Sequence, residues 1–182
     1  MWCQKKKIMR KCIFLGQFKC ESGKIRITDP CYKMETTRGI KSVDAPKGWW
    51  DAFVTRTDET NGWGTRNVIL EVYLSGFNGR RSDFYYLTKT GVDSGQCGFF
   101  DEDDFRINCD SESWYDKICQ ITLNGDDAGI TPDCRGAVSA SGFGDGEYIC
   151  EVSYDADTHM PVAFRLTFDD PFNNYEDEDE EW

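Results

Sequence analysis

The stretch Asn67-Val-Ile-Leu-Glu-Val-Tyr-Leu-Ser-Gly-Phe77 sets the expected fold class. Every second residue from Val68 to Leu74 is aliphatic, so an extended chain here has one apolar face and one mixed face. Asn-Gly pairs stand before and after it, at 61–62 and 78–79, and such pairs supply the positive φ angles of tight hairpins. The stretch therefore predicts a half-buried antiparallel strand between two turns.

The same period of two recurs along most of the chain. Further strands are expected over residues 12–20, 24–28, 49–57, 84–88, 136–141, 148–154 and 162–168, with 92–100 extended but rich in glycine. The Glu21-Ser-Gly23 stretch predicts a hairpin turn, and the segment 124–135 is expected to be a loop.

One segment has a helical period instead. Trp114, Ile118 and Ile121 recur at spacings of four and three, and Asp110 or Ser111 is placed to cap the first turn. The acidic residues 101–104 similarly favour a short helical turn, because carboxylates stabilise a helix N-terminus. The expected class is mainly β (α+β): a curled antiparallel sheet, a barrel or a sandwich, with one packed helix.

The length of 182 residues suggests one domain with extensions. We expect a basic N-terminal arm over 1–11, a single β-rich domain over 12–168 and an acidic disordered tail over 169–182. No apolar stretch approaches the roughly 20 residues of a membrane-spanning helix. No membrane association is therefore expected.

Charge is distributed unevenly along the chain. The 21 Lys and Arg and 33 Asp and Glu give a net charge of −12, but residues 1–41 hold 11 bases and 3 acids, whereas residues 82–182 hold 5 bases and 25 acids. An acidic surface repels nucleic acid and favours basic protein partners, although it also serves solubility alone. The acidic contacts expected are Asp101, Glu102, Asp103, Asp104, Glu176, Asp177, Glu178, Asp179, Glu180 and Glu181.

A glycine-rich stretch, Ser141-Gly-Phe-Gly-Asp-Gly146, offers an alternative site for a small ligand such as a nucleotide. Its members would be Asp93, Gly142, Gly144, Asp145 and Gly146. A phosphate-binding loop normally precedes a helix N-terminus, and here a strand is expected to follow. A kinked turn between two strands is the competing interpretation.

The residues favour a protein that is not an enzyme and that has no cofactor. The single histidine, His159, lies in an expected hairpin turn, so no histidine base is placed beside a nucleophile. A hydrolase would have to use carboxylates, with Asp29, Asp93 and Asp145 as the candidates. The nine cysteines lack the close pairs of a zinc site or a disulfide framework, which predicts reduced thiols, a cytoplasmic location and no bound metal.

Three motifs carry a resemblance to known proteins. The stretches 27–32 (Ile-Thr-Asp-Pro-Cys-Tyr), 91–101 (Gly-Val-Asp-Ser-Gly-Gln-Cys-Gly-Phe-Phe-Asp) and 141–148 (Ser-Gly-Phe-Gly-Asp-Gly-Glu-Tyr), with Gly48-Trp, resemble bacterial and phage proteins of the domain of unknown function 4241. That family implies no activity. In type, a small acidic protein of this kind also resembles the anti-CRISPR inhibitors. This second resemblance implies that the partner is a host type II RNA-guided DNA nuclease and that its DNA binding or cleavage is blocked. The channels in which such a nuclease holds nucleic acid are positively charged, so an acidic protein can occupy them.

Overall fold

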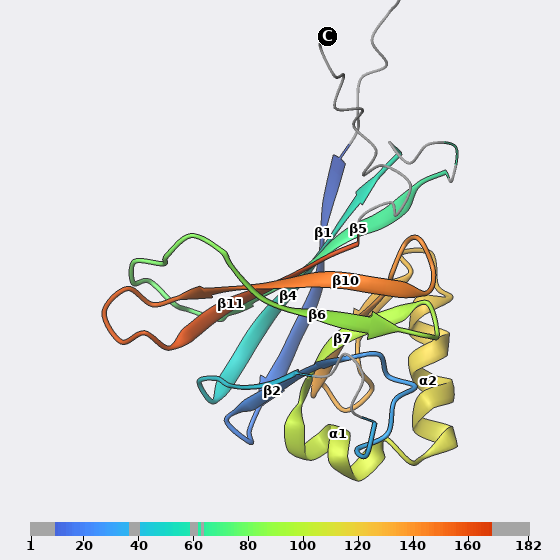
Figure 1. Cartoon of the computed structure of the whole chain (residues 1–182), viewed down its shortest axis with the longest axis horizontal. Helices are drawn as coiled ribbons and strands as arrows, with labels where there is room; N and C mark the ends of the chain where they lie inside the picture. Colours follow the sequence, from blue (N-terminus) through green and yellow to red (C-terminus); the bar gives the residue numbers. More distant parts are fainter. Residues whose placement is uncertain (1–9, 37–40, 59–61, 63, 169–182) are drawn as a thin grey trace, which may run out of the picture.

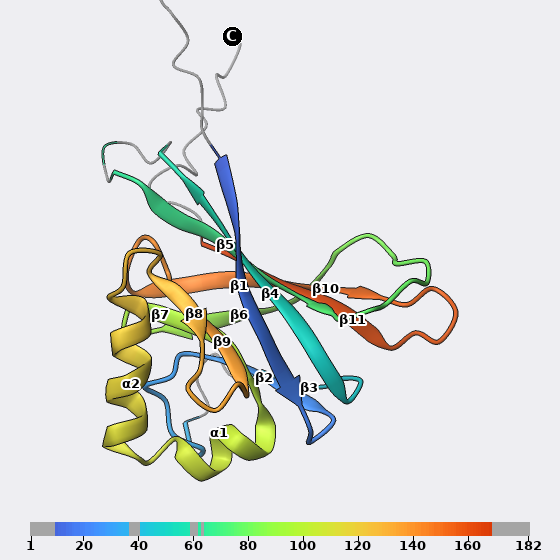
Figure 2. The ribbon, with the colours of Figure 1, turned by 180° about the vertical axis from the view of Figure 1, so that it is seen from behind.

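The computed structural model describes residues 10–36, 41–58, 62 and 64–168. These residues form two antiparallel sheets packed face to face, with two helices on the outer side of the smaller sheet (Figures 1 and 2). No helix in this part of the chain is long and apolar enough to cross a membrane.

The larger sheet has six strands in the order β1-β4-β5-β11-β10-β6. Its strands are β1 (Arg10–Cys20), β4 (Gly48–Thr57), β5 (Arg66–Leu74), β6 (Tyr85–Val92), β10 (Gly146–Tyr154) and β11 (Pro161–Thr167). The smaller sheet has five strands in the order β3-β2-β7-β9-β8. Its strands are β2 (Lys24–Thr28), β3 (Lys41–Asp44), β7 (Gln96–Asp101), β8 (Ala128–Ile130) and β9 (Gly136–Ala140).

Aromatic side chains from both sheets meet in the main core. The Trp50 and Phe164 ring centroids are 5.7 Å apart, and those of Phe99 and Phe164 are 5.9 Å apart. All three side chains are buried, and their contact joins β4 and β11 of one sheet to β7 of the other. Burial of large apolar surfaces of this kind is the dominant favourable contribution to folding.

The helices form a second, smaller core on the opposite face of β7. Successive strand residues point to opposite faces, so Phe99 enters the main core while Phe100 meets Phe105 and Trp114 of the helices. This arrangement explains why every residue of β7 is buried. The helices are α1 (Glu102–Asn108) and α2 (Glu112–Thr122), whose first turns are capped by the side chains of Asp101 and Ser111.

The structure confirms the mainly β class and the helix that Ser111 caps. The hairpin expected at 21–23 is wrong: these residues lead from β1 in the larger sheet to β2 in the smaller one, and the two strands pair with other partners. The structure resolves the expected choice of architecture in favour of two packed sheets, and it adds β3 and β8, which the sequence did not predict. The segment 92–100 contains the end of β6 and most of β7, joined by a tight turn. Two residues of the expected arm, Arg10 and Lys11, belong to β1.

Candidate functional site

The expected acidic contact at 101–104 divides into buried and accessible residues. Asp101 has no exposed surface. Its carboxylate accepts hydrogen bonds from the backbone amides of Glu21 (2.7 Å), Ser22 (2.8 Å) and Asp104 (3.1 Å), and from the Arg135 guanidinium at 2.9 Å. Burial alone would raise the pKa of Asp101, but these hydrogen bonds outweigh it and lower the pKa. Asp101 is therefore a buried, ionised residue whose hydrogen bonds link the turn between β1 and β2 to the start of α1.

Glu102 is also directed inward. Arg26 on β2 donates two hydrogen bonds to its carboxylate, from Nε to Oε2 and from Nη2 to Oε1, both 2.8 Å long. The two side chains are only 7% and 6% exposed, and the guanidinium lies 5.3 Å from the centre of the Phe105 ring. Burial opposes ionisation of Glu102, yet the bonds from Arg26 lower its pKa. Glu102 is ionised and paired.

These two residues correct the expectation that Asp101–Asp104 forms an exposed acidic contact. Asp101 and Glu102 serve the fold, whereas Asp103 is exposed and Asp104 is half-buried. Local sequence does not reveal these pairs, because Arg26 lies 76 residues from Glu102 and Arg135 lies 34 residues from Asp101. The six acidic residues expected at 176–181 lie outside the described residues.

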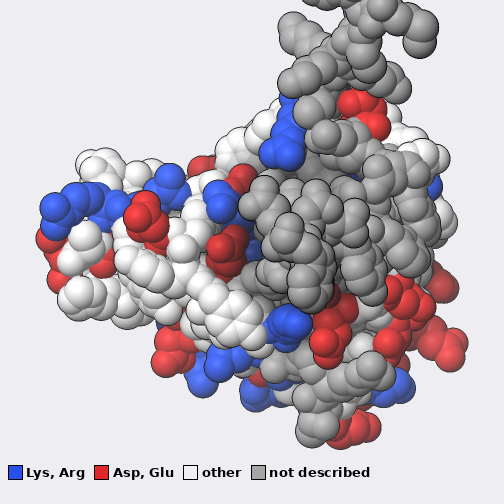
Figure 3. All heavy atoms as spheres, turned by 45° about the horizontal axis from the view of Figure 1, so that its top comes forward, with Lys and Arg blue, Asp and Glu red and all other residues white. Residues whose placement is uncertain are grey.

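The acidic surface that the structure does show is broader than the 101–104 run. Residues 101–133, which contain α1, α2 and β8, hold ten acids, eight of them at least partly exposed, and two bases, whereas the other described residues hold fourteen acids and fifteen bases. The negative excess of the described body therefore comes entirely from this segment. Figure 3 shows acidic side chains gathered at the lower right, on the side where Figure 1 places α2, while both signs are mixed at the left end.

We call this side the acidic helical side. Its exposed acids are Asp103, Asp110, Glu112, Asp116, Asp126 and Asp133. Within the described chain, no cation lies within ion-pair distance of Glu112, Asp116 or Asp133, whereas Asp110 has Lys33 at 3.2 Å. Sequence analysis did not single out Asp116 or Asp133, since each stands alone among neutral residues or beside a base.

Apolar side chains and a hollow accompany these charges. Ile107 after the first turn of α1 is 78% exposed, and Leu123 at the end of α2 is 82% exposed. A hollow of about 220 Å³ opens beside the start of α2. It is lined by Pro30, Cys31, Lys33, Cys109, Asp110, Ser111, Glu112 and Tyr115. The acidic helical side thus has exposed acids, a hollow and exposed apolar side chains, and protein-binding surfaces combine features of these kinds.

The candidate carboxylate Asp29 is buried in a junction between two motif loops. It has no exposed surface and accepts four hydrogen bonds: from the Cys31, Asp93 and Ser94 amides, each at 2.8 Å, and from the Ser94 hydroxyl at 2.6 Å. The Tyr32 hydroxyl donates to Asp93 at 2.8 Å. With its acceptor capacity filled and no access to solvent, Asp29 is built to hold loops together and not to meet a substrate.

The expected ligand loop is close to the same junction. Ser141 donates its amide to the Gly95 carbonyl at 2.8 Å, so the glycine-rich loop lies beside the turn that contains Asp93. Within the loop, the hydroxyls of Ser141 and Tyr148 donate to the Gly144 carbonyl at 2.6 and 2.8 Å. The structure therefore brings Asp93 near the 142–146 loop, and the loop's own hydroxyl donors hold its shape.

Gly142 shows what the glycines of this loop do. Its φ angle is +76°, and a Cβ at this position would collide with the backbone carbonyl oxygen of Asn67. Phe143 is buried in the main core, while Gly144, Asp145 and Gly146 are exposed. The glycine is thus required by the approach of the loop to β5, which supports the kinked-turn interpretation over a ligand cradle.

The thiol nearest to this junction is poorly suited to nucleophilic chemistry. Burial, together with a hydrogen bond to Asp29 and its charge, raises the pKa of Cys31 to about 12. At neutral pH the sulfur therefore keeps its proton, and the thiol form is a weak nucleophile. Among the residues that the structure describes, no three His, Cys, Asp or Glu side chains form a group able to hold a metal ion.

Comparisons with protein-family models, with curated proteins and with solved structures return no match for this chain. The resemblance carried by the three motifs consequently stays a prediction. What the structure adds is that segments from all three motifs pack together at the Asp29 junction.

Proposed function

We propose that this chain is a non-enzymatic binding protein that presents its acidic helical side to a basic protein surface. The observation that supports this proposal most directly is the location of the charge: the negative excess of the described body comes from residues 101–133. A localised field of one sign accelerates encounter with an oppositely charged partner and orients it. An acidic residue pattern that served solubility alone would not need to collect on one side.

The arrangement also supports selectivity beyond charge. Ile107 and Leu123 place aliphatic side chains among the acids, and exposed anchors of this kind provide much of the residence time in protein complexes. The hollow beside Glu112 and Tyr115 has room for a side chain of the partner. A basic protein with protruding Lys or Arg side chains fits such a surface.

We further propose that the partner is a host type II RNA-guided DNA nuclease and that binding blocks its DNA binding or cleavage. Such a nuclease holds nucleic acid in positively charged channels, and carboxylates of the acidic helical side would take the place of phosphates there. In this proposal the contacts are Asp103, Glu112, Asp116 and Asp133, together with the acids at 176–181.

A charge-reversal experiment tests the proposal. The variant Asp116→Lys/Asp133→Lys changes two exposed acids of the acidic helical side, and Asp83→Lys/Asp157→Lys changes two exposed acids elsewhere by the same amount. Binding to a purified nuclease–guide complex is measured by surface plasmon resonance, and inhibition by cleavage of a plasmid target. The first variant should bind at least about tenfold more weakly, and the second should bind as the natural chain does.

Two results would overturn the proposal. If the natural chain at saturating concentration leaves DNA binding and cleavage intact, the nuclease is not the partner. Should both variants lose binding equally, net charge and not the acidic helical side would explain the interaction. Added salt should weaken the natural interaction chiefly by slowing association.

A further inference from the structure

The larger sheet has one face turned toward the smaller sheet and one face turned outward. On β4, Trp50 and Ala52 lie in the main core, so Trp49, Asp51 and Phe53 point to the outward face. Both helices lie against the smaller sheet (Figures 1 and 2), and in the described part of the chain no helix covers the outward face. Trp49 is exposed, and Asp51 and Phe53 are half-buried. These side chains are therefore accessible to a ligand.

Aromatic rings from three neighbouring strands meet on this outward face. Phe14 on β1 stands opposite Phe53 on β4, with ring centroids 5.2 Å apart. The Phe53 ring meets the ring of Tyr73 on β5 at 5.9 Å and an angle of 74°. Phe14 is 56% exposed, so the cluster is not a buried core. A contiguous exposed apolar patch marks a binding surface more often than apolar residues scattered singly do.

A hollow of about 390 Å³ opens beside these rings. Its walls include Phe53, Tyr73 and Phe77, together with the charged residues Asp51 and Arg81. Sites for small ligands have volumes of about 300–1,000 Å³ and combine apolar walls with a few polar groups that orient the ligand. The size and the lining of this hollow match that description.

The Asp51 carboxylate is fixed in place and has one oxygen available. Its Oδ1 accepts hydrogen bonds from the Gln17 amide at 2.8 Å and from the Ser75 hydroxyl at 2.6 Å. The Gln17 amide also donates to Ser75 at 2.9 Å, which closes the network. Both bonds to Asp51 reach the same oxygen, and within the described residues Oδ2 accepts none. Asp51 thus offers an acceptor whose position is set before a ligand arrives.

Arg81 supplies hydrogen-bond donors in the same hollow. Its guanidinium lies 4.8 Å from the centre of the Tyr73 ring, and its backbone forms a β-bridge with Asp155. Within the part of the chain that the structure describes, no carboxylate lies at ion-pair distance from it. A guanidinium that stacks on a ring keeps N–H groups at its edge, and these can donate to a ligand.

This combination of groups suits a neutral molecule that carries several hydroxyls. A carboxylate only accepts hydrogen bonds and a guanidinium only donates them, whereas a hydroxyl does both. The C–H groups of a sugar ring also pack favourably on aromatic rings, whose faces are slightly negative. The net charge of −12 disfavours anions such as nucleotides, but it does not affect a neutral sugar.

We propose that the hollow binds one ring of a neutral saccharide. Asp51 Oδ2 and the Arg81 guanidinium bind its hydroxyls, and the walls at Phe53 and Phe77 contact its C–H groups. Trp49, which is 46% exposed and about 7 Å from Asp51 along β4, contacts the next ring of a longer saccharide.

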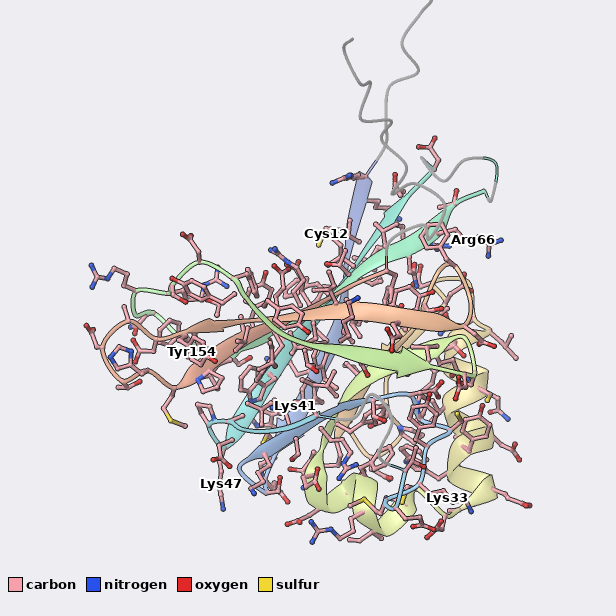
Figure 4. The ribbon with its side chains drawn as sticks, viewed as in Figure 1. Cys12, Lys33, Lys41, Lys47, Arg66 and Tyr154 are labelled. Atoms are coloured by element: carbon pink, nitrogen blue, oxygen red, sulfur yellow. The ribbon has the colours of Figure 1, made fainter. Side chains whose placement is uncertain are left out.

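The saccharide site is separate from the acidic helical side. The loop that contains Phe77 and Arg81 lies at the left of Figure 1, and α2 lies at the right. In Figure 4, Tyr154 marks the end of the sheet beside this loop, and Arg66 marks the opposite end. The Tyr154 carbonyl accepts the Ser82 amide of the same loop at 2.8 Å. The proposal is therefore independent of the nuclease proposal and is tested without any protein partner.

Nuclear magnetic resonance of the full-length, nitrogen-15-labelled chain tests the site. The probes are trisaccharides of glucose, mannose, galactose, xylose and N-acetylglucosamine, each added to about 10 mM, with adenosine monophosphate and phenylalanine as probes of other chemistry. At least one trisaccharide should shift the amide signals of Asp51, Tyr73 and Gly76 in a saturable way. The proposal is overturned if no trisaccharide moves these signals, or if only adenosine monophosphate or phenylalanine does.

Matched substitutions then test the assigned contacts with the trisaccharide that binds. Arg81→Ala should weaken its binding at least about tenfold, whereas Arg80→Ala, which removes an exposed neighbouring base, should change it by less than about twofold. Circular dichroism confirms that each variant folds. Equal effects of Arg81→Ala and Arg80→Ala would overturn the site.

A second pair of variants tests the contact at Trp49. Trp49→Ala should weaken the trisaccharide severalfold and leave the corresponding methyl monosaccharide unchanged, because Trp49 meets only the second ring. Tyr86→Ala, which removes an exposed aromatic residue of β6, should affect neither probe. If Trp49→Ala and Tyr86→Ala had the same effect on the trisaccharide, the placement of the second ring would be wrong.

Discussion

The inner and outer acids of this protein have the same chemistry and opposite environments. Asp101 and Glu102 are buried and bound to Arg135 and Arg26, whereas Asp116 and Asp133 are exposed with no ion-pair partner among the described residues. A buried carboxylate must be compensated by hydrogen bonds and opposite charge, while an exposed one is solvated and free to attract a partner. An acidic residue in the sequence therefore contributes to the surface charge only when the fold does not bury it beside a cationic partner.

The strongest test of the inner acids removes Arg26, the buried partner of Glu102. Arg26→Ala removes both hydrogen bonds that Arg26 donates to the buried Glu102 carboxylate, which keeps the weaker contact with the Arg106 guanidinium at 3.4 Å. We expect the free energy of unfolding, measured in urea, to fall by about 3–5 kcal/mol. Arg106→Ala, which removes the more exposed contact, should cost less than about 1 kcal/mol. Similar losses for the two variants would contradict the inner assignment of Glu102.

Asp29 extends the inner class to the loop junction. Asp29→Asn keeps the shape but replaces one carboxylate oxygen with an amide that cannot accept the Asp93, Ser94 or Cys31 donors. We expect a loss of about 2–3 kcal/mol in the same urea measurement, since hydrogen bonds to a charged group are stronger than neutral ones. Asp93→Asn, which disturbs one bond from Tyr32, should cost about 1 kcal/mol. Equal stability of Asp29→Asn and the natural chain would remove Asp29 from this class.

Acid should distinguish the two classes. The folded state lowers the pKa of Asp101 and Glu102 below their ordinary values of 3.8 and 4.5. Their contribution to stability is therefore complete above about pH 4.5 and is lost as the pH falls through the lower folded pKa values, because the unfolded chain binds protons first. Urea unfolding at a series of pH values between 7 and 3 should show this decline, and it should be shallower in Asp101→Asn. A parallel decline in both proteins would count against the role of Asp101.

Asp104 should behave in the opposite sense. Burial, with repulsion from Asp133 and Asp101, raises its pKa, so its ionised form is disfavoured by the fold. Asp104→Asn is expected to raise the midpoint of thermal unfolding slightly at pH 7, and this advantage should shrink as acid protonates the natural side chain. A lower midpoint at pH 7 would show that Asp104 has a favourable partner in the folded protein.

The smallest effect is expected at the outer acids. Asp116→Lys/Asp133→Lys should change the free energy of unfolding by less than about 0.5 kcal/mol per site, as both side chains are exposed. This result would allow any loss of partner binding to be attributed to the surface. A loss as large as that of Arg26→Ala would place these residues among the inner acids.

Local pattern accounts for what sequence analysis predicted correctly. The alternation in Val68–Leu74 and the spacing of Trp114, Ile118 and Ile121 describe single elements, and the corresponding β5 and α2 are present. The strand β8 has only three residues and begins in a stretch typical of turns, so its pairing with β9 depends on contacts that no local pattern records. The assignment of Asp101 and Glu102 to the surface failed for the same reason.

The sequence by itself determined the mainly β class, the helices and the polarity of charge along the chain, because side-chain period and charge are properties of neighbouring residues. Only the tertiary structure decided which carboxylates are internal, that segments of the three motifs meet at Asp29, and that the exposed negative charge collects beside α1 and α2. Each of these features requires residues tens of positions apart to come within a few ångströms, and such proximity arises when the two sheets and the helices pack together.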